Sequence, residues 1–190
     1  MTTEKETIYD EKNKINWDEI HDVIIIGAGF AGLSAAIEAA QAGAKVLVLE
    51  KMASYGGNSI ISDGGIAAPD TDLQKKQKIK DSPQLMYQDM IQAGLGLNNQ
   101  NLVKTVCERA KDAFNWTQCL GVKYLDRVDI FGGHSLPRCY TAKNITGATI
   151  IKKQIKKLKE CGVPLRYKSY VQKFIVNKEG RVIGVSTKKN

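Results

Sequence analysis

The pattern of apolar and polar positions is most regular between residues 22 and 50. Val23–Ile26 is a continuous apolar run, which is typical of a parallel strand that is buried on both faces. An alanine-rich stretch then predicts a helix from Phe30 to about Ala42, with Gly43 as its C-cap. Lys45–Leu49 is a second apolar strand and is followed by Glu50. The order of strand, helix and strand predicts an α/β unit.

Weaker patterns predict further elements in the rest of the chain. Ser82 and Pro83 have the residue types of an N-cap and a first helical position, and a helix should run from there to about Ala93. Later helices are expected to start at 98–99 and to span 145–160, and strands are expected at 122–125, 165–167, 171–176 and 182–185. A turn at 178–180 predicts a hairpin between the last two strands. The remaining glycine-rich segments, 52–69 and 131–141, are expected to be loops.

Three glycines lie at the junction between the first strand and the first helix. Gly27, Gly29 and Gly32 have the spacing G-x-G-x-x-G. The first glycine of this motif permits a tight turn, the second lets the backbone approach a pyrophosphate, and the third permits close packing of helix and strand. Glu50 has the position of an acid that binds a ribose hydroxyl, and the start of the helix carries a partial positive charge. The unit predicts dinucleotide binding; the alternative is a glycine-rich turn without a ligand.

The composition is that of an ordinary soluble globular protein, with 43% hydrophobic and 25% charged residues among 190, and the length alone favours one domain. The net charge of +8 comes largely from two lysine-rich runs, residues 75–80 and 152–159. Ile151, Ile155 and Leu158 recur at helical spacing in and beside the second run, so its lysines form the solvated face of an amphipathic helix. A functional basic patch is the alternative. Because no aromatic residues interleave with the basic ones, no nucleic-acid partner is expected.

The four cysteines are widely spaced and form no C-x-x-C or C-x-x-C-H motif. A metal site and covalently attached haem are therefore not expected, and the cysteines are interpreted as reduced thiols. Residues 1–20 form a polar tail that lacks the apolar core of a secretory signal and paired arginines. No run is long enough to span a membrane. The expected location is the cytoplasm, with the periplasm an option only if a targeting segment is missing.

The two glycine-rich loops carry polar residues whose roles the residue pattern leaves open. Residues 52–69 contain two Gly-Gly pairs together with Asn58 and Ser59. This composition suits a backbone that lies against a ligand, and it equally suits a plain connector. The second loop, 131–141, carries His134, which is interpreted as a catalytic, a ligand-lining or a structural residue.

A set of short segments from Asp22 onward matches the pattern of one protein family. They are Gly27–Gly32, Glu50–Lys51, Gly56–Ser59, Gly64–Ile66, Asp81–Pro83, Gly132–Ser135, Arg138, Thr146–Gly147, Val171 and Gly180–Gly184. With these segments the chain resembles the flavoprotein subunit family of fumarate reductase and succinate dehydrogenase, above all the soluble flavocytochrome c-type fumarate reductases. The resemblance implies an α/β fold, a Rossmann-like FAD-binding domain with a parallel sheet, helices and a β-hairpin or meander, incomplete at the C-terminus. Residues 1–20 would be a polar N-terminal tail and residues 21–190 the N-terminal portion of that domain, without the capping domain and the C-terminal FAD-binding segment.

The resemblance implies FAD as the cofactor. The residues that would contact FAD are Gly27, Gly29, Ala31, Gly32, Glu50, Lys51, Gly57, Asn58, Ser59, Gly64, Gly65 and Val171. In the family pattern the glycines of the first turn hold the pyrophosphate, and Glu50–Lys51 lie at the adenosine ribose. Residues 57–59 contact the phosphate and ribityl portion, residues 64–65 pass along the isoalloxazine, and the main chain of Val171 meets the adenine.

Two departures from the family pattern concern the cofactor linkage and the electron supply. Asn58 stands where the membrane-bound branch has a histidine that links covalently to FAD, so FAD is expected to be bound non-covalently. Soluble relatives with haem on the same chain carry C-x-x-C-H motifs, which this sequence lacks. The resemblance therefore implies a separate electron donor protein or a small reductant.

The implied activity is that of a FAD-dependent oxidoreductase acting on CH–CH groups. Hydride would pass between flavin N5 and an α,β-unsaturated carboxylic acid such as fumarate, or to flavin from the saturated acid. The family's substrate-binding and proton-donating arginines match no residue here, so the catalytic residues are expected beyond residue 190 and the chain alone is expected to be inactive. It would then be a fragment of a longer enzyme or a remnant. The alternatives are a non-catalytic FAD-binding fragment and an NAD-dependent dehydrogenase.

Overall fold

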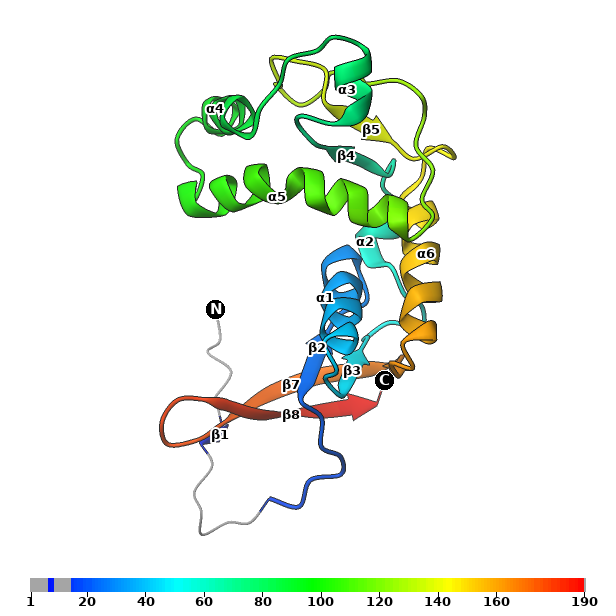
Figure 1. Cartoon of the computed structure of the whole chain (residues 1–190). Helices are drawn as coiled ribbons and strands as arrows, with labels where there is room; N and C mark the ends of the chain where they lie inside the picture. The colour runs from blue at the N-terminus through cyan, green and yellow to red at the C-terminus, as the bar shows by residue number, and fades with distance from the viewer. Residues whose placement is uncertain (1–6, 9–14, 190) are drawn as a thin grey trace. The chain divides into compact units, whose positions relative to one another are not determined.

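The computed structural model describes residues 7–8 and 15–189, so most of the expected polar tail, residues 1–20, lies outside the described residues. The chain divides into two compact units. The first unit comprises residues 1–58 and 154–190, and the second unit comprises residues 59–153. Figure 1 labels the helices and strands of both units.

The first unit contains a three-stranded parallel sheet. Its strands are β2 (Val23–Ile26), β3 (Val46–Leu49) and β6 (Leu165–Arg166), in the order β2-β3-β6. Helix α1 (Phe30–Gln41) connects β2 to β3, as expected, and every residue of β3 is buried. The expectation that β2 is buried on both faces is wrong, since Ile26 is 50% exposed. The reason is that β2 is an edge strand of the described sheet and pairs only with β3.

Helix α1 ends in the manner predicted from Gly43. This glycine has φ +91°, a left-handed conformation that costs a residue without a side chain little. Its amide donates to the carbonyl oxygen of Ala40, and the amide of Ala44 donates to that of Ala39, each at 3.0 Å. The two hydrogen bonds form a Schellman motif, which satisfies carbonyl groups of the last turn and directs the chain into β3.

The second sheet of the first unit is built on a hairpin. Strands β7 (Ser169–Val176) and β8 (Val182–Lys189) pair antiparallel, and the short strand β1 (Thr7–Ile8) pairs parallel with β7. The predicted hairpin is therefore confirmed, with strands longer than expected. Gly180 in its turn has φ +77°, and the amide of Gly180 donates to the carbonyl oxygen of Asn177 at 3.0 Å.

The second unit is mainly helical. Its elements are α3 (Asp72–Lys76), α4 (Pro83–Ala93), α5 (Gln100–Cys119) and a two-stranded antiparallel sheet of β4 (Gly65–Ala67) and β5 (Cys139–Thr141). Figure 1 shows α4 and α5 as consecutive helices joined by a short connection. Two further helices, α2 (Gly57–Ile60) and α6 (Gly147–Glu160), cross the boundary between the units in sequence.

Side-chain caps fix the starts of α4 and α5. The hydroxyl of Ser82 accepts a hydrogen bond from the amide of Leu85 at 3.1 Å, and a proline occupies the first turn of α4. The side-chain oxygen of Asn99 accepts from the amide of Leu102 at 3.2 Å. Both caps confirm the helix starts predicted from the sequence, because Ser and Asn side chains satisfy amides that lack an acceptor inside the helix.

The structure departs from the sequence predictions in the irregular parts of the chain. Residues 122–125, all of which the structure describes, form no strand and contribute only an isolated bridge. The expected loops 52–69 and 131–141 contribute β4 and β5, whose pairing partners lie far away in the sequence. Helix α6 begins at Gly147 and not at residue 145, because Ile145 has φ +50°, outside the right-handed helical region.

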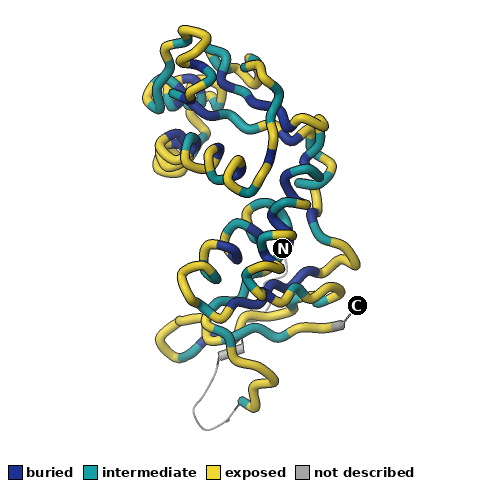
Figure 2. The backbone as a smooth tube through the Cα atoms, turned by 45° about the vertical axis from the view of Figure 1, so that its right-hand side comes forward, coloured by how far each residue is buried: buried dark blue, intermediate teal, exposed yellow. Residues whose placement is uncertain are grey.

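An aromatic cluster lies in the core of the second unit. The ring of Phe114 lies 4.8 Å from that of Tyr124 and 4.4 Å from that of Tyr140, which is fully buried. The buried residues of α5 recur every three or four positions and are Val103, Cys107, Ala110, Phe114 and Thr117. Figure 2 shows this alternation of buried and exposed residues along the helices. One face of α5 therefore packs on the core and the other faces solvent.

The four cysteines form no disulfide among the described residues. Within the described part of the chain, no helix combines the length and the apolar character that a membrane crossing requires.

Candidate functional site

The turn between β2 and α1 is shaped by two glycines. Gly27 has φ +98°, and its amide donates to the carbonyl oxygen of Leu49 at 2.8 Å. A Cβ atom on Gly32 would lie 2.0 Å from the carbonyl oxygen of Gly27, a contact that a real side chain cannot make. The helix therefore approaches the strand this closely only with glycine at position 32. These observations agree with the tight turn predicted at Gly27 and with the close packing of helix and strand predicted at Gly32.

The start of α1 offers main-chain donors to an external acceptor. The first four amides of any helix lack an acceptor inside the helix. The N-cap is Gly29, which makes no side-chain cap hydrogen bond, and the first turn contains no acidic residue. Ala31 is exposed and Gly32 is half-buried. This helix end therefore suits an anionic group such as a diphosphate, which the helix dipole also favours.

Glu50 follows the last residue of β3 and is held in place by main-chain amides. Its carboxylate accepts hydrogen bonds from the amide of Ala28 at 2.9 Å and from that of Met52 at 2.8 Å. The residue is only 7% exposed. A carboxylate has about four lone-pair sites, so two remain for ligand hydroxyl groups. The first-turn amides and this fixed carboxylate fit the diphosphate and the ribose of an adenine dinucleotide.

The other predicted FAD contacts of the first unit lie on segments whose main chain is hydrogen-bonded to the glycine turn or to Glu50. The amide of Gly56 donates to the carbonyl oxygen of Ala28 at 2.8 Å, and this bond fixes the segment that continues into Gly57 and Asn58, both exposed. The amide of Ser169 donates to the carbonyl oxygen of Glu50 at 2.9 Å.

Because Ser169 is hydrogen-bonded to Glu50, the half-buried Val171 lies two residues along the chain from that bond. Lys51, between Glu50 and Met52, is exposed. The first unit contains nine of the predicted FAD contacts. Hydrogen bonds of main-chain amides connect the segments that carry them, namely the glycine turn, residues 50–51, residues 57–58 and the strand of residue 171.

Three predicted contacts, Ser59, Gly64 and Gly65, belong to the second unit. Gly64 is buried with φ +73°, and a Cβ atom there would lie 2.8 Å from the main chain of Thr146. Packing and backbone conformation therefore explain this glycine without a ligand. Gly65 is exposed at the start of β4, and a Cβ atom there would meet only the side chain of Asp63, at 3.2 Å. The fold alone would accept a small side chain at position 65.

The second unit also contains a group of charged side chains that the sequence did not connect. Arg138 is fully buried and donates to both oxygens of Asp81, from Nε and Nη2 at 2.8 Å each. Its Nη1 donates to the Oδ2 of Asp89 at 2.5 Å. The main-chain amide and the hydroxyl of Ser135 both donate to the same oxygen of Asp89 at 2.9 Å. Asp81, Asp89, His134, Ser135 and Arg138 are called the Arg138 cluster below.

The electrostatics of the Arg138 cluster favour its charged groups. Burial alone would raise the pKa of Asp89, but hydrogen bonds from Ser135 and the charge of Arg138 outweigh it and lower that pKa. Burial alone would lower the pKa of Arg138, but Asp81 and Asp89 outweigh it and raise that pKa. The guanidinium and the Asp89 carboxylate are therefore both charged at neutral pH.

His134 takes part in the Arg138 cluster as a neutral acceptor. Its Nδ1 lies 3.1 Å from Nη1 of Arg138, and a guanidinium can only donate. The proton of the neutral imidazole must therefore be on Nε2. Burial, and after it the charge of Arg138, lowers the pKa of His134. Among the roles left open for this residue, these contacts support a structural one.

The sequence pointed to Arg138 and Asp81 only as separate positions of a family pattern. Asp81 and Arg138 are 57 positions apart and Asp89 and Arg138 are 49 apart, so no local spacing connects them. Asp89 was not singled out at all. The available signal was that a buried arginine requires acidic partners, but burial of Arg138 cannot be seen in the residue pattern of a loop.

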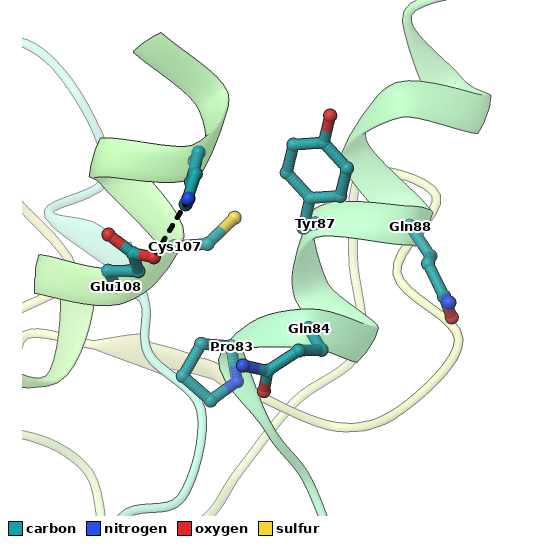
Figure 3. Close-up of a pocket in the computed structure, with 7 residues that line it drawn as sticks. Pro83, Gln84, Tyr87, Gln88, Cys107 and Glu108 are labelled. Atoms are coloured by element: carbon teal, nitrogen blue, oxygen red, sulfur yellow. Dashed lines mark ion pairs between the residues drawn. The ribbon is translucent and has the colours of Figure 1, made fainter. Parts of the chain in front are cut away.

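A cavity between α4 and α5 is lined by none of the predicted FAD contacts. It has a volume of about 330 Å³ and is lined by Pro83, Gln84, Tyr87, Gln88, Lys104, Cys107 and Glu108. Figure 3 shows these side chains, with an ion pair between Lys104 and Glu108 at 4.0 Å. Burial raises the pKa of the Cys107 thiol, so this sulfur is protonated and a weak nucleophile at neutral pH. The cavity offers no reactive group.

Comparisons with known proteins identify the family of the chain. The family model described as "FAD binding domain" matches residues 22–190. The acrylate reductase flavoprotein subunit of Shewanella woodyi is 39% identical over 179 residues, which are 94% of this chain and 35% of that protein. A fumarate reductase (cytochrome) of Shewanella frigidimarina is 35% identical over 169 residues, which are 88% of this chain and 29% of that protein.

The fold of the chain is similar to that of a solved fumarate reductase structure. The open conformation of a flavocytochrome c3 fumarate reductase superimposes with a TM-score of 0.86 and 32% identity, over 90% of this chain and 31% of that one. The chain thus spans about a third of the length of the relatives that it matches. The α/β, Rossmann-like class and the cofactor expected from the sequence are confirmed. With the family model covering residues 22–190, the chain belongs to the FAD binding domain family.

Proposed function

We propose that the chain is the FAD-binding part of a reductase that acts on the carbon–carbon double bond of an unsaturated carboxylic acid. The observation that carries the FAD site is the buried Glu50 carboxylate, held by the amides of Ala28 and Met52 beside the glycine turn. The substrate class is supported by the similarity to an acrylate reductase flavoprotein subunit and a fumarate reductase.

In this proposal the residues of the chain bind and orient FAD. The amides at the start of α1 hold the diphosphate, and Gly27 and Gly32 keep strand and helix close enough to present them. Glu50 accepts hydrogen bonds from the adenosine ribose. FAD, when bound, supplies the flavin ring that carries hydride to or from the substrate. Gly65, which the fold alone does not require, is the proposed point of closest main-chain approach to that ring.

We propose further that FAD is bound without a covalent link. Asn58 is exposed near the start of α2, and its neutral amide is not a nucleophile that could attach to the flavin. The four cysteines are free and form no C-x-x-C-H motif, so no haem is attached to the residues of this chain. Electrons would then come from a group outside these 190 residues, such as a separate protein or a small reductant.

A titration of the purified chain with FAD and, separately, with NAD tests the cofactor. We expect saturable binding of one FAD per chain and much weaker binding of NAD. After acid precipitation the flavin absorbance should appear in the supernatant, because no covalent bond retains it. Tighter binding of NAD than of FAD would favour a nicotinamide-dependent dehydrogenase, and flavin colour in the pellet would contradict non-covalent binding.

A chimera tests the reaction class. Residues 22–190 would replace the matching segment of the Shewanella woodyi acrylate reductase flavoprotein subunit, to which the chain is 39% identical over 179 residues. We expect the chimera to bind FAD and to reduce acrylate or fumarate with reduced viologen as the electron source. A chimera that is folded and loaded with FAD but reduces neither acid would contradict the reductase proposal while leaving FAD binding intact.

A further inference from the structure

No residue of the Arg138 cluster is a proposed FAD contact, yet the cluster is the most extensive buried charged network among the described residues. The side chains of Arg138 and Asp81 are 0% exposed and that of Asp89 is 8% exposed. Asp81 also accepts hydrogen bonds from the side chain of Gln74 at 2.8 Å and from the amide of Ser82 at 2.8 Å. Both oxygens of Asp81 and one oxygen of Asp89 thus accept hydrogen bonds from protein donors.

The main chain of Arg138 is paired with the strand that carries Gly65. The carbonyl oxygen of Arg138 accepts from the amide of Ala68 at 2.9 Å, and the next residues, β5, pair antiparallel with β4. At the other end of this ladder the amide of Ala142 donates to the carbonyl oxygen of Gly64 at 3.1 Å. The ladder from Gly64 to Ala68 is therefore continuous, and Arg138 stands at one end of it.

The side chain of Arg138 is attached to α4. Asp81 immediately precedes the N-cap Ser82, and Asp89 lies inside the helix. The guanidinium thus binds one carboxylate before the first turn of α4 and one about two turns further along. The amide and hydroxyl of Ser135 add a second link between the loop before β5 and α4. Main chain and side chain together connect α4, through β5, to β4.

Buried ion pairs do not in general stabilise a fold more than apolar side chains of similar volume would. Their geometry, however, is exacting, because a planar guanidinium with two carboxylates allows one arrangement only. The core of this unit already has the aromatic contacts of Phe114 with Tyr124 and Tyr140. The Arg138 cluster therefore fixes the position of β5 and is not the main source of the stability of this unit.

We propose that Arg138 is a positioning residue for FAD binding. By holding β5 on α4 it fixes β4, and with it the main chain of Gly64 and Gly65, in the place where the flavin ring is bound. The inference rests on the proposed function, because that function assigns Gly64 and Gly65 to the flavin. Arg138 itself touches neither cofactor nor substrate in this scheme.

Amide hydrogen exchange of the chain without FAD tests the positioning directly. In Arg138→Met we expect the exchange rates of the Ala68 and Ala142 amides to rise at least about tenfold more than those of amides in the middle of α5, which report any loss of global stability. Arg138→Lys should fall between this variant and the wild type, because an ammonium cannot make the bidentate contact. The matched control is Arg109→Met, since Arg109 makes only an exposed ion pair with Asp112.

The second measurement uses FAD. We expect Arg138→Met to bind FAD at least about tenfold more weakly and to change the position of the bound-flavin absorbance bands, because displacement of a contacting segment by about 1 Å is costly. Should Arg138→Met fail to fold, Ser135→Ala removes one hydroxyl donor to Asp89 and is expected to give the same changes at smaller amplitude.

The outcomes separate the two claims. Exchange at Ala68 and Ala142 that rises no more than exchange in the middle of α5, in folded Arg138→Met or in Ser135→Ala where the first variant is unfolded, would overturn the positioning role. Faster exchange with unchanged FAD affinity and an unchanged flavin spectrum would overturn it as well, and would leave Arg138 a purely structural residue. A wild-type chain that does not bind FAD would instead refute the proposed function, with the exchange data still deciding whether Arg138 fixes β4.

Discussion

The two units use different chemistry to fix their polar groups. In the first unit, one buried carboxylate, Glu50, is held by two main-chain amides within a segment of about 25 residues. In the second unit, two carboxylates are held by the side chain of Arg138, which lies about 50 residues away in the sequence. The first arrangement leaves acceptor capacity on the carboxylate for a ligand, whereas the second pairs its carboxylates with a buried charge of opposite sign.

This difference indicates which of the two arrangements is suited to bind a ligand. Amides at a helix start are suited to bind an anion because they lack an acceptor inside the helix. The charges of the Arg138 cluster are paired with one another, so in our proposal the cluster acts on FAD only through the position of its main chain. The most strongly charged interior of a domain is thus not necessarily its binding site.

The largest effect is expected from breaking the cluster of the second unit. Asp81→Ala removes the bidentate partner of a fully buried guanidinium and should lower the free energy of unfolding by about 3–5 kcal/mol. Urea denaturation monitored by far-UV circular dichroism measures this change. Asp112→Ala removes an exposed partner of Arg109 and should change it by no more than about 0.5 kcal/mol. Equal effects of the two substitutions would contradict the contrast between buried and exposed charges.

Next in size is the loss of close packing in the first unit. Gly32→Ala places a Cβ atom 2.0 Å from a main-chain oxygen and should lower the free energy of unfolding by about 1–3 kcal/mol. It should also abolish detectable FAD binding, because the helix start moves away from the strand. Thermal denaturation and fluorescence titration with FAD measure the two effects. Ala35→Ser, on an exposed position of the same helix, is the control and should leave FAD binding unchanged.

The substitution Glu50→Gln tests how much the carboxylate of the first unit contributes to FAD binding. A glutamine retains one acceptor oxygen, so one of the two amides now bonded to Glu50 loses its partner and the ribose loses a charged acceptor. We expect the FAD dissociation constant, measured by isothermal titration calorimetry, to rise about 10- to 100-fold. Glu179→Gln, in the exposed turn of the hairpin, should leave it unchanged. An unaltered affinity in Glu50→Gln would remove the ribose from the proposed role of this residue.

The smallest effect concerns the pH dependence of the second unit. The pKa of His134 is lowered in the folded chain, so its contribution to stability is present above the ordinary pKa of about 6.5 and is lost as the pH falls through the lowered value. In His134→Asn the side-chain oxygen still accepts from Arg138, but this titration is absent. Between pH 8 and pH 5 the wild type should therefore lose more free energy of unfolding than the variant. Parallel pH profiles of the two proteins would show that His134 is not protected from protonation.

The sequence predicted well those features that depend on neighbours along the chain. The strand Val23–Ile26, the start of α1 and the cap of α4 at Ser82 were placed correctly, because periodicity and capping are local. The order of glycines, helix and acid predicted dinucleotide binding, and the resemblance of further segments to a flavoprotein family implied FAD. The match to the FAD binding domain family bears out both. The FAD-contacting roles of individual residues remain predictions that the substitutions above address.

The features that the sequence missed depend on tertiary partners. Residues 122–125 have strand-forming side chains but pair with residues 141–143 only through an isolated bridge, which is too short to make a strand. Strands β4 and β5 form in glycine-rich segments because each supplies the other's hydrogen bonds. Ile26 is exposed because β2 has a neighbour on one side only in the described sheet. The Arg138 cluster is the extreme case, since its acids and its arginine come together only in the folded unit.

The central claim is that FAD lies with its diphosphate at the start of α1 and its ribose at Glu50. A titration of the isotope-labelled chain with FAD, followed by amide nuclear magnetic resonance, tests it directly. The account predicts saturable shifts of the amides of Gly29, Ala31, Gly32 and Met52 at one FAD per chain. Saturable FAD binding that leaves these four amides unshifted would contradict it.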